Sequence, residues 1–397
     1  MQHQPQPAKM FIDLGFAQRC KHGENICGDA FKFVKTGEGS CLVAVLSDGL
    51  GSGVKANILS SMTSVMAMKF ACQKPFSVLR AAETMMSALP ICSVRKISYA
   101  TFTILNASVS GEIRVIEMGN PPFLYFQGLA HQVLAGEELT SPRWQDRTMK
   151  QYTFQAEEGD RILFFSDGIS QAGLGTVAYP LGWTEPDYCR YLSEVLEQQP
   201  DISSQQLCQL LTRQALSKES GGINLDDMTC ACVYFRQRRE MLLFTGPPYD
   251  ARRDGECAAY LAAFPGDKVI SGGTSADIVA RELGREVNTD LQDINGVVPP
   301  QANMAGIDLV TEGVFTLTRA IAYLENFAGA PADNAAGRLV EILLRNDAIH
   351  FLVGTRVNEA HQDPNLPQEL DIRRNIVGKL AEVLRNKYYK EVDIKYI

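Results

Sequence analysis

Runs of apolar residues along the chain follow two patterns, and the change between them lies near residue 236. In the first stretch the runs are short and separated by turn residues, which is typical of antiparallel strands. We predict strands at residues 11–18, 30–34, 42–46, 98–106, 112–118, 122–126, 152–156, 161–166 and 228–235, and helices at 54–70, 76–87, 188–197 and 203–218. Two groups of strands interrupted by helix pairs suit a central β-sandwich flanked by helices.

The second stretch begins after a charged cluster at residues 236–240, which we interpret as a solvated linker. Beyond it strands and helices alternate, which favours a mostly parallel sheet covered by helices. Strands are expected at residues 241–245, 268–271, 286–291, 307–310 and 348–353, and helices at 256–263, 275–283, 315–327, 333–345 and 371–388. The sequence therefore predicts an α+β domain at residues 1–237 and an α/β domain at residues 238–397.

Composition and charge argue against several classes of protein. The 397 residues are 45% hydrophobic and 21% charged, as in an ordinary globular protein of two domains. The net charge of -8, without a long basic stripe, argues against nucleic-acid binding. No apolar run approaches the length of a membrane span, and residues 1–7 are polar, so we expect no membrane association and no signal peptide. The expected location is the cytoplasm.

Ten cysteines are scattered along the chain without any Cys-x-x-Cys pair. Free cysteine packs as a small hydrophobe, and the closest pair, Cys230 and Cys232, would lie on one face of a core strand. Cys20 and Cys27 flank the first of the acidic motifs described below and are candidates for redox sensitivity. The pattern as a whole suits a reducing compartment.

The most informative stretch is residues 47–53, with the sequence Ser-Asp-Gly-Leu-Gly-Ser-Gly. It separates the apolar run 42–46 from the helix predicted at 54–70, so we predict a glycine-rich turn between a buried strand and a helix. A carboxylate at the end of a buried strand, here Asp48, is costly unless a cation or hydrogen-bond donors receive it. Taken alone, the stretch is explained equally well as a tight turn with an N-capping serine.

Three further segments also place aspartate beside a predicted strand end. They are Gly28-Asp29, Ser166-Asp167-Gly168 and Asp226-Asp227-Met228-Thr229. One such aspartate is usually a turn residue or a cap. Four of them in one domain, three without a neighbouring basic residue, fit hard cations bound by oxygen ligands.

In this order the four motifs resemble those of the metal-dependent protein phosphatases, the PPM or 2C-like family. Within that family the chain is most similar to the bacterial SpoIIE-like serine phosphatases. Residues 98–102 (Ser-Tyr-Ala-Thr-Phe) and 119–122 (Gly-Asn-Pro-Pro) lie where that branch has a strand and a Gly-x-Pro-Pro turn. The resemblance covers residues 10–237 and implies the β-sandwich fold of the family.

The resemblance also implies a reaction: hydrolysis of phosphoserine and phosphothreonine by a water activated between two divalent cations, Mn²⁺ or Mg²⁺. In the family pattern Asp48 bridges both ions and the Gly49 carbonyl binds one of them. Asp167 and Asp226 complete the ligands of one ion, and Asp29 serves the other directly or through water. The substrate would be a phosphorylated protein, by analogy an anti-sigma-factor antagonist.

Two departures from the family pattern affect the expected site. Arg19 or Lys21 matches only loosely the phosphate-binding arginine of eukaryotic members, so substrate choice would depend on protein docking. Asn120 occupies a turn in which some relatives have an aspartate for a third ion, so a third ion is not expected. The alternative hypothesis is a catalytically silent signalling module whose acidic turns are vestigial.

The second domain offers a candidate anion site at Gly272-Gly273-Thr274-Ser275, between a predicted strand and a predicted helix. Glycines and the free N–H groups of a helix N-terminus can bind an anion. Glu312 ends a neighbouring predicted strand and would suit a sugar hydroxyl or a metal, so we expect a phosphorylated metabolite or a nucleotide. The same four residues are also a common turn and helix cap.

Overall fold

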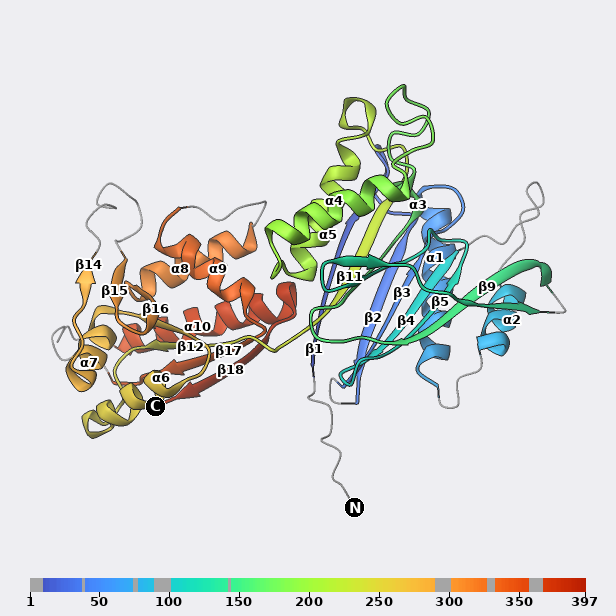
Figure 1. Cartoon of the computed structure of the whole chain (residues 1–397). Helices are drawn as coiled ribbons and strands as arrows, with labels where there is room; N and C mark the ends of the chain where they lie inside the picture. Colours follow the sequence, from blue (N-terminus) through green and yellow to red (C-terminus); the bar gives the residue numbers. More distant parts are fainter. Residues whose placement is uncertain are drawn as a thin grey trace, which may run out of the picture. The chain divides into compact units, whose positions relative to one another are not determined.

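The computed structural model of the chain describes residues 10–37, 40–73, 78–88, 101–141, 144–289, 301–326, 333–356 and 367–397. It divides into two compact units, Met1–Gln237 and Arg238–Ile397, which we call the N-terminal unit and the C-terminal unit. Each unit has its own sheet system (Figure 1). The parts of the predicted elements that fall on residues 76–77, 98–100, 290–291 and 327 lie outside the described residues.

Two antiparallel sheets form the centre of the N-terminal unit. One has the strand order β1-β11-β10-β6-β7 and the other β2-β3-β4-β5-β9-β8. The strands are β1 (Phe11–Arg19), β2 (Ala30–Thr36), β3 (Cys41–Ser47), β4 (Phe102–Ser108), β5 (Glu112–Met118), β6 (Leu124–Gln127), β7 (Ala130–Gln132), β8 (Glu137–Ser141), β9 (Trp144–Gln155), β10 (Arg161–Phe165) and β11 (Met228–Arg236). Inward-facing apolar side chains from both sheets, including Leu42, Leu46, Phe164 and Val233, form one core between them.

Helices pack against both sheets. The helices are α1 (Gly53–Ala71) and α2 (Val78–Ala88) beside the β3 sheet, and α3 (Asp167–Ser170), α4 (Glu185–Gln198) and α5 (Ser204–Leu216) beside the β11 sheet, with a short 3-10 turn at Ser220–Gly222. Leu192 of α4 and Leu211 of α5 pack with Phe165 and Cys230 of the sheet. The predicted sandwich flanked by helices is therefore confirmed, and Cys230 and Cys232 are buried as expected.

The hairpin of β8 and β9 was not predicted in full. Its sequence is largely polar and lacks the alternation by which a half-buried strand is recognised. Pairing with β5 on one side and β8 on the other holds β9 in the sheet along most of its length. Its strand character therefore comes from its neighbours.

The C-terminal unit contains a seven-stranded sheet in the order β14-β15-β16-β13-β12-β17-β18. Five strands are parallel, namely β12 (Glu240–Thr245), β13 (Asp267–Ser271), β16 (Ile307–Thr311), β17 (Ala348–Val353) and β18 (Glu391–Tyr396). Two short strands, β14 (Asn288–Thr289) and β15 (Ala302–Met304), run antiparallel at one edge. The helices are η2 (Ala251–Arg253), α6 (Asp254–Ala263), α7 (Gly273–Leu283), α8 (Val314–Glu325), α9 (Ala335–Arg345) and α10 (Pro367–Tyr388).

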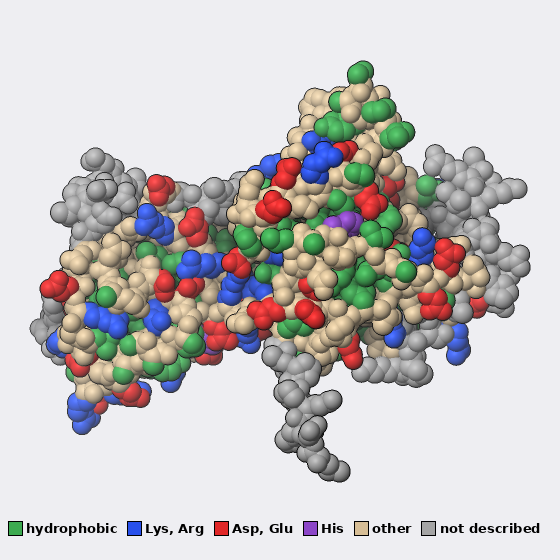
Figure 2. All heavy atoms as spheres, in the orientation of Figure 1, with side chains coloured by type: hydrophobic (Ala, Val, Ile, Leu, Met, Phe, Trp, Pro, Cys, Tyr) green, Lys and Arg blue, Asp and Glu red, His purple; other side chains and the backbone are tan. Residues whose placement is uncertain are grey.

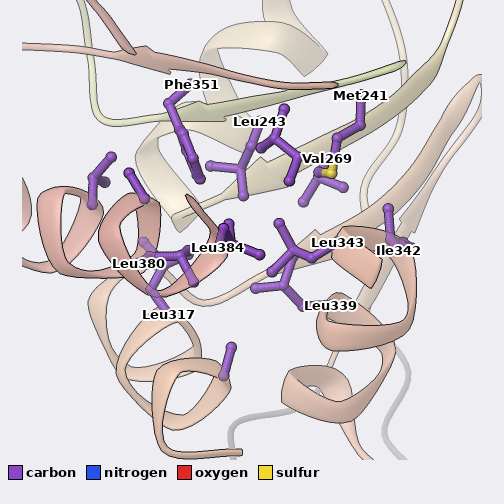
Figure 3. Close-up of a cluster of buried hydrophobic side chains, with 14 of the residues drawn as sticks. Met241, Leu243, Val269, Leu317, Leu339, Ile342, Leu343, Phe351, Leu380 and Leu384 are labelled. Atoms are coloured by element: carbon purple, nitrogen blue, oxygen red, sulfur yellow. The ribbon is translucent and has the colours of Figure 1, made fainter. Parts of the chain in front are cut away.

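Alternate residues of the central strands face opposite helix layers. Leu243 and Phe351 pack against Leu317 of α8, Leu343 of α9 and Leu380 of α10 (Figure 3). On the other face, Leu261 of α6 and Val279 of α7 pack with Phe244 of β12. The predicted α/β unit with a mostly parallel sheet is confirmed. Two strands, β15 and β18, were not predicted, and β14 is the part of the strand expected at residues 286–291 that the described residues contain.

On the face seen in Figure 2, lysine and arginine side chains are interspersed with aspartate and glutamate among the residues described. Within the described parts of the chain, no helix combines the length and the apolar character needed to cross a membrane.

Candidate active site

The first pair of predicted metal ligands lies where β2 begins and β3 ends, on one side of their sheet. These strands are antiparallel, with Ala30 opposite Ser47. Asp29 directly precedes β2 and Asp48 directly follows β3, so both come to the same edge of the sheet. The backbone N–H of Thr101 donates to the Asp48 carbonyl at 3.0 Å, which fixes the chain where the strand ends.

The second pair lies at an edge of the other sheet. Strands β10 and β11 are antiparallel, with Phe165 opposite Cys230, and the Ser166 N–H donates to the Thr229 carbonyl at 2.9 Å. Asp167, the first residue of α3, follows β10, and Asp226 precedes β11. The topology therefore brings these two aspartates together as well.

Hydrogen bonds join the two edges. The side-chain amide of Gln18 donates to the Asp29 carbonyl at 3.1 Å and to the Thr229 hydroxyl at 3.2 Å. The Asp48 and Asp167 carboxyl groups lie close enough for each to shift the pKa of the other. Each sheet thus supplies two aspartates to one region of the N-terminal unit.

The Asp29 carboxylate lies in an environment that disfavours its charged form. Burial raises the pKa of Asp29 to about 7; hydrogen bonds from Thr229 and Ser166 oppose this rise, and the nearby charges of Asp227 and Asp226 add to it. Asp29 is only 3% exposed, and its Oδ2 atom has no hydrogen-bond partner. The described groups with the largest effects on its pKa include no cationic side chain, so its burial is not balanced by them.

The pKa of Asp48 is raised further than that of Asp29. Burial raises its pKa to about 9, with additional contributions from the charges of Asp29, Asp167 and Asp226. Burial also raises the pKa values of Asp167 and Asp226. Four carboxylates that repel one another in a partly dehydrated region are typical of a cation site, because bound cations would remove both the repulsion and the desolvation cost.

The donor set and its spacing suit two cations better than one. All four groups are carboxylates, which hard divalent cations prefer. No three of them bring one oxygen each within 4.8 Å of one another. They are close enough to influence one another's ionisation, yet too widely spread for a single ion to gather them without movement.

Gly49 has a steric requirement of its own. A Cβ atom on Gly49 would lie 2.1 Å from the carbonyl oxygen of Ala56 in α1, so only glycine fits there. This close packing holds the residue next to Asp48. The role of the Gly49 carbonyl as a metal ligand remains a prediction.

Of the two basic residues considered for phosphate binding, Lys21 lies nearer the carboxylates. Its charge lowers the pKa of Asp226, although burial has the larger, opposite effect on that group. Arg19 is exposed at the end of β1. In the Gly119 turn, Asn120 donates through its amide to the Thr103 hydroxyl at 3.0 Å, so its side chain serves the turn.

Sequence reasoning missed the role of Asp227. This residue is 3% exposed and accepts hydrogen bonds from the backbone N–H groups of Lys21 and Gly28, each at 2.9 Å. Its own N–H donates to Asp226 Oδ1 at 2.9 Å. The adjacent aspartates of the Asp-Asp-Met-Thr motif therefore differ in function: Asp226 faces the other carboxylates and Asp227 anchors the loop before Asp29.

The expectation of free cysteines is wrong for one pair. Cys20 and Cys27 form a disulfide that closes the loop between β1 and β2, with a Cα–Cα distance of 4.4 Å. Scattered spacing gives no information about pairing, because pairing depends on how the loop folds back. The other seven cysteines that the structure describes are free.

In the C-terminal unit, the predicted anion residues lie at the ends of β13 and β16. Gly272 caps α7 with a φ of 123°, which favours glycine, and the helix begins at Gly273 instead of Ser275. A Cβ on Gly313, the cap of α8, would lie 3.4 Å from the Gly272 Cα. Ser275 is fully buried and its hydroxyl has no hydrogen-bond partner, whereas Glu312 is exposed.

Comparison with known proteins identifies the family. The family model described as stage II sporulation protein E (SpoIIE) matches residues 38–236, which include Asp48, Asp167 and Asp226. Asp29 lies just outside the matched range.

Several solved structures are similar at low identity. The phosphatase domain of the cell fate determinant SpoIIE from Bacillus subtilis is 19% identical, with a TM-score of 0.45 over 58% of this chain and 94% of that chain. The RsbU and RsbW domains of Rv1364c from Mycobacterium tuberculosis are 18% identical, with a TM-score of 0.47 over 64% and 70%. RsbX in complex with magnesium is 18% identical, with a TM-score of 0.39 over 56% and 95%. No curated protein sequence matches this chain.

The SpoIIE match spans about half of the chain. It covers most of the sandwich and three of the four clustered aspartates. The chain therefore belongs to the SpoIIE family, within the PPM (2C-like) protein phosphatases.

Proposed function

We propose that this protein is a metal-dependent serine/threonine protein phosphatase of bacterial signalling. The observation that carries the proposal is the group of four aspartates at adjoining edges of the two sheets, whose pKa values are all raised by burial. Members of the family use divalent metals, and the donor set here fits Mn²⁺ or Mg²⁺.

Asp48 has the position expected of a ligand shared by two cations, because Asp29, Asp167 and Asp226 all influence its ionisation. Asp167 and Asp226 would hold one ion and Asp29 the other. When bound, such ions acidify a water molecule and neutralise phosphoryl charge. Lys21 supplies positive charge next to Asp226, where the anionic substrate would approach.

The alternative, a catalytically silent signalling module, is less well supported. A silent protein gains stability when a buried carboxylate is replaced by a neutral side chain. All four aspartates are nevertheless present, at a cost in stability that only a bound cation would offset. This argues for an active metal site.

The substrate class proposed is a phosphorylated protein. The family acts in bacterial signalling, and an anti-sigma-factor antagonist is the substrate that analogy suggests. The residues of the site do not themselves select among phosphoproteins, so docking outside the site would provide specificity.

The test is phosphatase activity of the full chain on p-nitrophenyl phosphate and on a phosphoserine protein. We expect hydrolysis with Mn²⁺ or Mg²⁺, loss of activity with a chelator and recovery when metal is restored. Asp48→Asn should be inactive, and its control is Asp254→Asn, which changes a buried aspartate of the C-terminal unit. Metal-independent hydrolysis, or none with any divalent cation, would contradict the proposal.

For the C-terminal unit we propose an anion-binding role at Gly272 to Ser275. Two glycine-capped helix N-termini lie next to each other there, and neither has a side-chain cap. The buried, unpaired Ser275 hydroxyl offers a further donor. In a nucleotide or sugar phosphate, the phosphate would accept hydrogen bonds from the backbone amides, and a sugar hydroxyl would donate to Glu312.

Thermal shift with nucleotides and sugar phosphates tests this role. A Cβ atom at Gly273 would meet no atom within 4 Å, so Gly273→Ala fits without a clash and is the steric control for Gly273→Asp, which adds negative charge. We expect a ligand that stabilises the wild type and Gly273→Ala but not Gly273→Asp. If no ligand behaves in this way, these residues only cap the helix.

A further inference from the structure

The loop closed by the Cys20–Cys27 disulfide is connected directly to the proposed metal site. It leads from β1 into Gly28 and Asp29, so its last residues set the position of the first carboxylate. It also contacts α1, which follows Asp48 and Gly49 in the chain, and the segment before β11, which carries Asp226.

The connection to the segment before β11 passes through Asp227. One oxygen of this carboxylate accepts the N–H of Lys21 and the other accepts the N–H of Gly28. Each of these residues directly follows one of the bonded cysteines. The disulfide therefore holds side by side the two N–H groups that one buried carboxylate binds, and this carboxylate adjoins Asp226.

Two asparagines strengthen the arrangement. The Asn224 side chain donates to the Cys20 carbonyl at 2.8 Å and to the Asp226 carbonyl at 2.9 Å. The Asn57 side chain of α1 donates to the Cys27 carbonyl at 2.8 Å. Both ends of the closed loop are thus hydrogen-bonded to segments that carry Asp226 or follow Asp48.

We propose that Cys20 and Cys27 are a thiol–disulfide modification site whose redox state controls how tightly the adjacent carboxylates hold divalent cations. In the disulfide form the loop presents both amides to Asp227 and keeps Asp29 and Asp226 in place. In the dithiol form the two loop ends separate, Asp227 loses part of its hydrogen bonding, and the metal affinity falls.

The chemistry needs a dithiol reductant and an oxidant such as a peroxide. A thiolate of the reductant attacks Cys20 Sγ, which is the more accessible sulfur because Cys20 is half-buried and Cys27 is 7% exposed. Cys27 leaves as the thiolate, and the second thiol of the reductant resolves the mixed disulfide. Two electrons and two protons are transferred, giving two cysteine thiols and an oxidised reductant. Hydrogen peroxide reverses the change: both thiols lose hydrogen, the S–S bond forms as the O–O bond breaks, and two water molecules are released.

The first measurement is independent of phosphatase activity. Full-length, metal-free protein is prepared oxidised and, after removal of dithiothreitol under nitrogen, reduced; peptide masses verify the state of Cys20 and Cys27. We expect the backbone amides of Lys21 and Gly28 to exchange with deuterium faster in the reduced protein. Equal exchange in both states would overturn the proposal, whatever the protein's enzymatic function.

The second measurement is Mn²⁺ affinity by calorimetric titration. Loss of groups hydrogen-bonded to metal ligands weakens metal binding by about 10- to 100-fold, and we expect a rise in Kd of about tenfold on reduction. Activity should fall at limiting Mn²⁺ and recover at saturating Mn²⁺. This part rests on the proposed function: absence of Mn²⁺ binding in both states would count against the metal site, whereas equal affinity in both would overturn the redox control.

Variants separate the loop from general effects of reduction. The double variant Cys20→Ser, Cys27→Ser should behave as the reduced protein under all conditions. Cys72→Ser removes an exposed cysteine elsewhere and should leave the redox response unchanged. Asp227→Asn should abolish the difference in Mn²⁺ affinity between oxidised and reduced protein, because the carboxylate that accepts both loop amides is gone. A redox response that persists in Asp227→Asn would overturn the proposed connection.

Discussion

The strand ends of the N-terminal unit gather four aspartates whose pKa values are raised, whereas the C-terminal unit buries an aspartate at the start of α6 that is paired with arginine. Asp254, 4% exposed, binds Arg281 at 2.7 Å, and Arg356 lies at 4.0 Å from its other oxygen. Both units thus bury negative charge. At Asp254 arginine side chains balance that charge, whereas the pKa values of the four clustered aspartates stay raised.

The difference shows how a site can be recognised from its electrostatic balance. A fold that is selected for stability alone pairs its buried charges or replaces them. The side chains with the largest effects on the pKa values of the four clustered aspartates include one cation. It is Lys21, which acts on Asp226. Neutralising a carboxylate should therefore have opposite effects on stability in the two units.

Asp48→Asn is expected to have the largest effect. Activity should fall by a factor on the order of 10³, which corresponds to about 4 kcal/mol of transition-state stabilisation. The metal-free variant should be more stable than the metal-free wild type at pH 7, by about 2 kcal/mol, because the wild type must take up a proton at Asp48 when it folds, whereas asparagine needs none. Assays with Mn²⁺ and urea unfolding without metal measure the two effects. Near-wild-type activity would sink the assignment of Asp48.

Glu117 tests whether the N-terminal unit also buries a carboxylate with a raised pKa outside the proposed metal site. It is 6% exposed, burial raises its pKa to about 7, and it accepts the Phe123 N–H at 2.7 Å. A raised folded-state pKa means that the contribution to stability is complete below pH 4.5 and is lost as the pH rises through 7.

For Glu117→Gln we expect this loss to disappear, since the amide keeps an acceptor for Phe123 but carries no charge. The difference in unfolding free energy between variant and wild type should grow by about 2–3 kcal/mol from pH 4 to pH 8. Urea unfolding of the two proteins across this range provides the measurement. A constant difference across the range would show that Glu117 ionises normally.

Asp254→Asn is the corresponding experiment in the C-terminal unit. Here the variant should lose about 1–2 kcal/mol of stability, because Arg281 loses its partner while remaining largely hydrated. Phosphatase activity should be unchanged. If this variant were stabilised as Asp48→Asn is expected to be, the contrast between the two units would be wrong.

The smallest effect is expected from separating the units. A chain that ends at Gln237 should fold and hydrolyse p-nitrophenyl phosphate within about twofold of the full-length rate, because each unit has its own core. Circular dichroism and the same metal-dependent assay would test this. An insoluble or inactive fragment, with the full chain active, would show that the N-terminal unit depends on residues beyond Gln237.

Much of the fold could be predicted from local sequence. The periods of apolar residues predicted most strands and helices, because a half-buried strand and an amphipathic helix each repeat over a few residues. Patterning failed where packing was decided by neighbours: β9 is polar yet paired on both sides, and β18 is a short edge strand.

The identity of the four aspartates was likewise determined by the sequence, through motifs that follow one another along the chain. What the tertiary structure alone decided was their environment. The raised pKa values depend on burial and on charges from the other sheet, and Asp227 meets its two amide partners across 206 and 199 residues. The Cys20–Cys27 bond arises in the same way, because the folded loop brings the two sulfurs together. Motif order is a local property of the chain, whereas the ionisation and pairing of these side chains depend on which distant segments the fold packs around them.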